Sequence, residues 1–352
     1  MTINRPPSTP PSSNVINAYR RRRRHSSISG ISILAGLFVL GGIAVLIYWL
    51  RQPGQPLSTL FATDTPTPTI TYTPTNTSTP TETQIPPTST PMPPTFTPAP
   101  PVGSFILSDN VVMMYVPAGA FSMGGEAHGD EKPIHTVNLD AYYIDKFEVT
   151  NAAYKRCVDA GVCNPPKQSD SYSRQAYYGN PKFDEYPVIY VDWNMAKIYC
   201  EWRGGRLPAE AEWEKAARGM DGRTYPWGND FDGTKLNFCD KNCVFGWAKK
   251  NVGDGYADTA PAGSYLDGVS PYGVHDMAGN VWEWVNDWYG SVYYQISPSL
   301  NPWGPDSGEY RVLRGGAWED KQSNVRSANR SWTGPETFYN SVGFRCARGI
   351  SP

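Results

Sequence analysis

The sequence lacks several features that would each indicate a particular class of protein. It has no Cys-x-x-Cys pair and only four histidines, none close enough to a cysteine to complete a zinc-binding pattern. Long amphipathic stretches with a 3.6-residue period are few and no internal repeat is present, which excludes a helical bundle or a solenoid. A basic surface is missing too: residues 1–109 hold 7 of the 31 basic and 3 of the 33 acidic residues, leaving 24 and 30 beyond. This mildly acidic remainder argues against nucleic acid as a partner.

The most hydrophobic part of the chain is the uncharged run at 31–50. As a helix it would rise roughly 30 Å, the thickness of the hydrocarbon core of a bilayer. Five arginines at 20–24 precede it and only Arg51 follows directly, so the positive-inside rule keeps the N-terminus cytoplasmic. A cleaved signal peptide and a buried core helix are the weaker alternatives, because signal peptides have shorter apolar regions. We therefore predict a basic cytoplasmic tail at 1–29 and a transmembrane helix at 30–51, with the rest of the chain extracytoplasmic at the cell membrane.

A segment rich in proline, threonine and serine follows, at 52–104. It offers too little apolar surface to offset the conformational entropy that folding would remove. We predict a disordered stalk that holds the following domain away from the membrane, and whether it carries O-linked glycans stays open.

All six cysteines lie beyond the stalk, on the side of the membrane where disulfides form. Two pairs are close enough in sequence to close small loops, and the remaining two cysteines would join the middle of the domain to its end. The spacing thus predicts three disulfides: Cys157–Cys163, Cys239–Cys243 and Cys200–Cys346.

Beyond residue 110 the sequence is dense in aromatic residues, glycine and proline, which is typical of short elements joined by long ordered loops. Strand-like alternation occurs at 111–119, 135–150 and 309–318. We expect one helix at 193–202, and another that carries Pro208 in its first turn and ends near Gly219.

Seven segments, in order along the chain, resemble the formylglycine-generating enzyme family, also called the sulfatase-modifying factor family. They are VPAGAFSMG (116–124), EKPIHTVNLDAYYIDKFEVTNAAY (131–154), YPVIYVDWNMAKIYCEWRGGRLPAEAEWEKAARG (186–219), YPWGN (225–229), YGVHDMAGNVWEW (272–284), RVLRGGAW (311–318) and GFRCA (343–347). The resemblance implies an irregular α+β domain over 105–352, with little regular secondary structure and related to C-type lectins. It also implies a disulfide between the cysteine after the first helix and that of GFRC, which supports Cys200–Cys346.

The resemblance further implies two structural Ca²⁺ sites. Carboxylates on a Gly-Asn turn suit this hard cation, although such a turn alone is more often only a turn. One site maps onto Asp276, Gly279, Val281 and Glu283, and the other onto Asn237, Phe238, Asp254 and Tyr256.

Oxidases of this family convert a cysteine of a client sulfatase into formylglycine, using O₂ and copper(I) bound by two cysteines just after RGGS. Copper(I) prefers sulfur ligands. Here the serine is Ala317, the first cysteine position is Asp320, and the second falls near Asn324 or Val325. The sequence therefore predicts no catalytic residue at this place and makes copper an unlikely cofactor.

Two hypotheses concern the side chains around this segment. Arg314, Ala317, Trp318, Asp320 and Arg330 form a candidate ligand groove, the alternative being that the arginines make internal salt bridges.

We predict a non-oxidase binding or accessory module for a polypeptide or a cell-envelope ligand. The alternatives are a formylglycine-generating oxidase, or another modifying enzyme with an altered centre, and a calcium-dependent, lectin-like carbohydrate binder. The sequence does not name the ligand or the oligomeric state.

Overall fold

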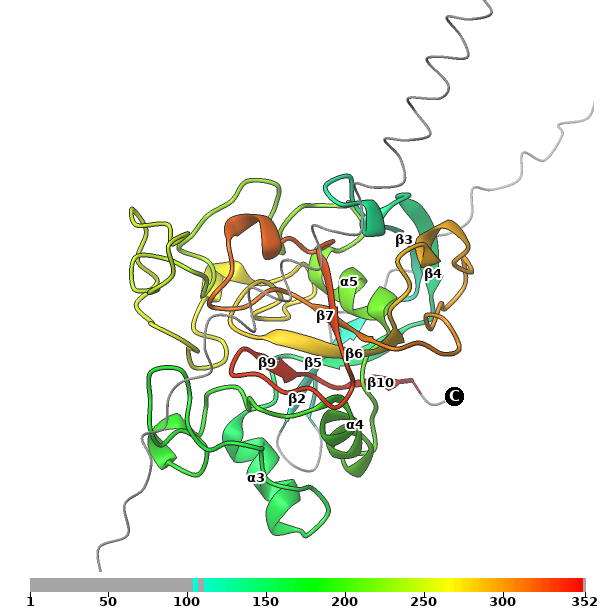
Figure 1. Cartoon of the computed structure of the whole chain (residues 1–352). Helices are drawn as coiled ribbons and strands as arrows, with labels where there is room; N and C mark the ends of the chain where they lie inside the picture. Colours follow the sequence, from blue (N-terminus) through cyan, green and yellow to red (C-terminus); the bar gives the residue numbers. More distant parts are fainter. Residues whose placement is uncertain (1–103, 107–110, 351–352) are drawn as a thin grey trace, which may run out of the picture. The chain divides into compact units, whose positions relative to one another are not determined.

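Residues 104–106 and 111–350 are described by a computed structural model, shown in Figure 1. Over these residues the fold is mixed α/β with few helices and long ordered connections, as the sequence predicts. The predicted cytoplasmic tail and membrane helix, and all of the predicted stalk except Ser104, lie outside the described part. No helix within the described part is long and apolar enough to cross a bilayer.

Three sheets carry the strands. The first is antiparallel, in the order β1 (Ser104–Ile106), β2 (Val112–Val116), β5 (Tyr142–Asp145) and β10 (Ala347–Gly349). The second is the antiparallel pair of β3 (Gly119–Met123) and β4 (His135–Leu139). The third has the order β8 (Arg330–Thr333), β7 (Arg311–Arg314), β6 (Trp282–Trp288) and β9 (Val342–Phe344), with β6 and β9 parallel.

The alternation predicted within 135–150 is realised in β4, which pairs with β3, a strand that was not predicted. Phe121 pairs with Val137 in register and both are buried, while Ala120 and Thr136 point outward. Because successive side chains of a strand point to opposite faces, one face of this hairpin joins the core.

Two helices occur where the sequence predicts them. In α4 (Trp193–Trp202), the side chain of Asp192 caps the first turn by accepting a hydrogen bond from the Met195 amide. The other, α5 (Glu210–Arg218), begins two residues after Pro208, which was predicted to lie in its first turn. It ends at Gly219, whose φ of 72° is in the region that favours glycine.

A third helix, α3 (Asn151–Asp159), was not predicted. Thr150 caps it by accepting from the Ala153 amide. Short 3-10 helices lie at Gly129–Glu131, Pro181–Phe183, Leu266–Gly268, Tyr293–Gln295 and Gln322–Asn324.

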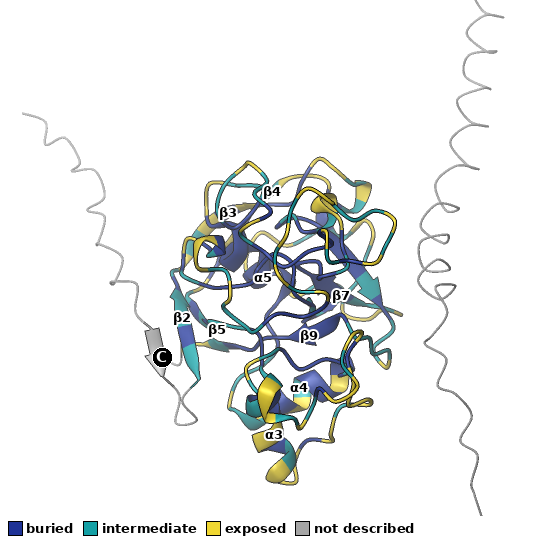
Figure 2. Cartoon of the chain, turned by 90° about the vertical axis from the view of Figure 1, so that its left-hand side faces the viewer, coloured by how far each residue is buried: buried dark blue, intermediate teal, exposed yellow. Residues whose placement is uncertain are grey.

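The α5 helix is buried along its whole length although it carries five charged side chains (Figure 2). Lys215 donates hydrogen bonds to the carbonyls of Pro117 and Gly119, at 2.7 and 2.8 Å. Glu214 is paired with Arg218 and Arg314. The helix thus joins the β3–β4 hairpin to the third sheet through buried polar contacts rather than through an apolar stripe alone.

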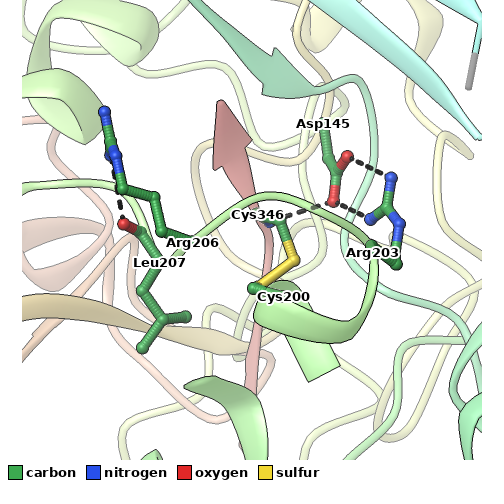
Figure 3. The surroundings of a disulfide bond; sticks show 6 residues. All are labelled: Asp145, Cys200, Arg203, Arg206, Leu207 and Cys346. Carbon is green, nitrogen blue, oxygen red and sulfur yellow. Dashed lines mark hydrogen bonds and ion pairs between the residues drawn. A yellow bond between two sulfur atoms is a disulfide. The ribbon is translucent and has the colours of Figure 1, made fainter. Parts of the chain in front are cut away.

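The structure contains the three predicted disulfides. Cys200–Cys346 joins α4 to the segment between β9 and β10 (Figure 3). Beside it, Asp145 accepts a hydrogen bond from the Cys346 amide at 2.9 Å and forms an ion pair with Arg203 at 2.7 Å. The first sheet, α4 and the end of the chain are therefore fixed together at one point.

Candidate functional site

The segment after β7 turns sharply at Gly315 and Gly316, whose φ angles are 94° and 79°. A side chain at Gly316 would meet the backbone of Asn324 and Val325, with the Asn324 carbonyl oxygen at 2.9 Å from its Cβ. Only glycine allows this close approach of two backbone segments without strain. The turn brings residues 317–320 against 324–325, the two places at which the resemblance predicts the family's cysteine pair.

Asp320 is buried, and its hydrogen bonds stabilise this turn. Its carboxylate accepts from the Ala317 amide at 3.1 Å and from the Asn324 side chain at 2.7 Å. Its backbone carbonyl accepts from the Cys239 amide. At the position of the first family cysteine, the carboxylate therefore holds the loop closed.

Every cysteine of the chain is in one of the three disulfides, so no thiol is available to this segment. Since copper(I) prefers sulfur ligands, the residues here do not fit a copper(I) centre.

Arg314 and Arg330 make the internal salt bridges that were the alternative to ligand binding. Both side chains are fully buried: Arg314 pairs with Glu214 at 2.5 Å and Arg330 with Glu210 at 2.7 Å. Arg314 also donates to the carbonyls of Ser327, Ala328 and Asn329, which follow in this order along the chain.

Of the other proposed groove residues, Ala317 and Trp318 are buried as well. The Trp318 ring lies beneath Tyr172, with the ring centroids 5.1 Å apart. The groove itself stays a prediction, but the five side chains assigned to it lie below the surface rather than on it.

The second predicted calcium site contains a buried acceptor without a donor. The Asn237 side-chain nitrogen donates to the Asp258 carbonyl and to Asn280, which fixes the orientation of the amide. Its Oδ1 accepts no hydrogen bond from any described group. Asp254 accepts from the amides of Phe238 and Tyr256, and burial raises its pKa to about 7. An unsatisfied amide oxygen and a poorly solvated carboxylate fit a hard cation.

The first predicted calcium site gathers buried negative charge. Burial raises the pKa of Asp276 to about 6, and the neighbouring charge of Glu283 acts in the same direction. Glu283 is fully buried, and Arg345 donates to both of its carboxylate oxygens at 2.7 Å.

A further acid, Glu148, belongs to this group and was not predicted. It is buried, and its pKa is raised well above the usual value by burial and by the charges of Asp276 and Glu283. Glu148 accepts from the Asn280 side chain, which also accepts from Asn237. The signal in the sequence is one acid between Phe147 and Val149 in a strand-like stretch.

Among the described residues, three acids interact here with one guanidinium, that of Arg345, and a divalent cation could balance the ionised carboxylates in excess of it. In the described residues no three His, Cys, Asp or Glu side chains converge to hold an ion by themselves. Both predicted sites therefore also depend on backbone and amide oxygens, such as those assigned to Gly279 and Val281.

Comparison with known proteins defines the class of protein. The family described as "Sulfatase-modifying factor enzyme 1-like domain" matches residues 106–350, so the chain belongs to this family.

Individual relatives cover the same region. The chain is 36% identical over 255 residues to "Serine/threonine-protein kinase pkn1" of Chlamydia caviae, covering 68% of this chain and 38% of that protein. It is 33% identical over 291 residues to "Formylglycine-generating enzyme" of Mus musculus, covering 68% and 76%. The solved structure "Structure of PvdO from Pseudomonas aeruginosa" has a TM-score of 0.61 at 28% identity and covers 71% of this chain and 99% of that one. The chain thus spans well under half of the chlamydial kinase that it matches.

Proposed function

We propose that the chain is a non-oxidase binding or accessory module of the sulfatase-modifying factor family, carried outside the cytoplasm on a membrane helix and a stalk. The observation that supports the proposal most strongly is that the chain has no free cysteine, since all six are paired in disulfides. Asp320 stands where the resemblance predicts the first copper-binding cysteine. The hydrogen bonds of Asp320 to Ala317 and Asn324 give this carboxylate a structural role.

The test is mass spectrometry of a peptide with the sequence Cys-x-Pro-x-Arg after incubation with the full-length chain, copper(I), a mild reductant and oxygen. We expect the thiol to remain a thiol, while the mouse formylglycine-generating enzyme converts it under the same conditions. The three disulfides must be verified as intact after the incubation. An aldehyde product would contradict the proposal and support an oxidase with an altered centre, and Asp320→Asn would then be the first variant to assay.

Calcium is part of the proposal as a structural ion. Asn237 and Asp254 would hold one ion, and Asp276 and Glu283 the other, each with backbone carbonyls of their loops. When bound, the ions would supply positive charge to the carboxylates of Asp254 and Asp276, whose pKa burial raises.

Removing calcium with EDTA should therefore lower the melting temperature. A ligand present at 100 times its Kd stabilises the folded state by about 2.7 kcal/mol, which corresponds to about 5–10 °C for a domain of this size. Differential scanning calorimetry measures the shift.

The Asp254→Asn variant should show a smaller fall in melting temperature on EDTA treatment. The Asp230→Asn variant, changed at an exposed aspartate, should show the same fall as the unmodified chain. An equal EDTA response in all three proteins would count against the second site.

A further inference from the structure

Next to the segment that replaces the copper centre, four aromatic rings form a cluster that reaches the surface. Tyr172 lies 5.9 Å from Phe245 and 5.1 Å from Trp318, measured between ring centroids. Phe245 stacks on Trp247 at 4.9 Å with an angle of 4° between the ring planes. Tyr172 is 44% exposed, Phe245 and Trp247 are half-buried, and Trp318 forms the buried floor. We refer to these four residues as the aromatic platform.

The platform is held in place from both sides of Tyr172. The buried carboxylate of Asp258 accepts from the Ser171 hydroxyl at 2.6 Å and from the Ser173 amide at 2.9 Å, and pairs with Arg174. This fixes the residues that flank Tyr172.

The rest of the platform is equally constrained. The Cys239–Cys243 disulfide closes the loop just before Phe245. The Trp247 indole donates to the Glu319 carbonyl at 2.8 Å. Rings that are already ordered lose little conformational entropy when a ligand stacks on them.

Three lysines lie on the segments that carry the platform, although the ammonium of Lys249 lies over another ring, that of Phe231, at 4.3 Å from its centroid. The Lys321 ammonium is 6.0 Å from the Trp247 ring centroid, Lys250 donates to the Cys243 carbonyl, and Lys249 donates to Gln322. Within the described part of the chain none of the three forms an ion pair with a carboxylate.

The acids around the platform differ in exposure. Asp240 and Asp320 are buried, and their carboxylates accept internal hydrogen bonds. Asp170, close to Tyr172 in the sequence, is exposed, and Glu319 is half-buried. The surface thus combines partly exposed aromatic side chains with three lysines that form no ion pair in the described part of the chain.

We infer that the aromatic platform binds an anionic polysaccharide, with the apolar C–H faces of sugar rings on Tyr172, Phe245 and Trp247 and the carboxylates on Lys250 and Lys321. This rests on the proposed binding function and specifies its ligand class. Aromatic rings offer large, rigid contact faces, and charge complementarity favours a polyanion.

An acidic peptide fits less well. The indole N–H groups of Trp247 and Trp318 both donate to backbone carbonyls of the domain, so neither is available to a peptide. The described segments 239–250 and 317–322 contain no strand whose edge could pair with a peptide backbone.

The binding experiment uses the purified full-length chain in detergent, titrated with hyaluronan oligosaccharides, a carboxylated polymer, and followed by calorimetry. Dextran serves as the neutral polysaccharide and poly-L-glutamate as the acidic polypeptide. We expect hyaluronan to bind more tightly than both, with an affinity that falls as salt concentration rises.

Variants locate the site. Tyr172→Ala should weaken hyaluronan binding about five- to tenfold, the range expected for the loss of one stacking ring. Lys250→Ala with Lys321→Ala should weaken it about three- to fivefold and flatten the salt dependence. The matched controls, Trp303→Ala at another ring of 44% exposure and Arg156→Ala on α3, should bind as the unmodified chain does.

The inference would be overturned by hyaluronan binding no tighter than dextran binding, or by equal losses in the platform and control variants. Tighter binding of poly-L-glutamate that Tyr172→Ala weakens would also overturn it, in favour of an acidic peptide. Conversion of the Cys-x-Pro-x-Arg peptide would instead contradict the proposed non-oxidase function. The hyaluronan titration tests polysaccharide binding independently of that result.

Discussion

Replacing Cys200 and Cys346 together with alanine should lower the free energy of unfolding by about 4–5 kcal/mol. The disulfide spans 146 residues, and a cross-link that closes so long a loop removes much of the conformational entropy of the unfolded chain. Both sulfurs are buried next to the Asp145–Arg203 ion pair, so the native state also loses packing there. Urea denaturation followed by tryptophan fluorescence measures the change.

The Cys239–Cys243 pair provides a matched control, because these cysteines are equally buried but only four residues apart. By the same chain-entropy relation, the double alanine variant should lose only about 2 kcal/mol. If both double variants lost the same free energy, loop length would not be the cause and the stabilisation would be local.

These disulfides show what the sequence could predict about the fold. Two pairs are visible from short spacing, and the third from the remaining cysteines and the resemblance to the family. Helices α4 and α5 were predicted because Gly204-Gly205 and Gly219 mark their ends. Helix α3 was missed because its residues follow a strand-like stretch, and its cap, Thr150, closes that stretch.

The site could be predicted only in part, because burial depends on partners far away in the sequence. The arginine of RGGAW can bind a ligand or form an internal salt bridge. Its contact with Glu214, 100 residues earlier in the sequence, shows that it forms the salt bridge. Glu148 could not be assigned for the same reason, since its neighbours Asp276 and Glu283 lie more than 100 residues later. Residue type and spacing show which side chains are capable of chemistry, whereas tertiary contacts determine which of them remain accessible.

The second large effect is expected at the Arg314–Glu214 pair, where both side chains are fully buried. Burial alone would raise the pKa of Glu214, but Arg314 and Arg218 hold it below its usual value. Arg314→Met leaves Glu214 with Arg218 as its only ion-pair partner among the described residues, and it removes the donors to the 327–329 carbonyls. Breaking a buried ion pair by removing one partner typically costs about 3–5 kcal/mol, and we expect a loss in this range.

A double-mutant cycle separates this structural role from ligand binding. Glu214→Met should also destabilise the fold, because within the described part of the chain it leaves buried Arg314 with Glu210, 3.6 Å away, as its one carboxylate partner. The double variant should lose less free energy of unfolding than the two single losses added together. Both charges of the pair are then absent, so neither Glu214 nor Arg314 remains as a buried charge without its partner. Urea denaturation of the four proteins gives the coupling energy, for which we expect about 1–3 kcal/mol. Strictly additive losses would mean that Arg314 and Glu214 do not stabilise each other. An Arg314→Met variant of unchanged stability would mean that the arginine does not stabilise the domain. In that case Arg314 would again be a candidate for ligand binding, because substitution of a binding residue lowers the affinity for the ligand without lowering the stability of the fold.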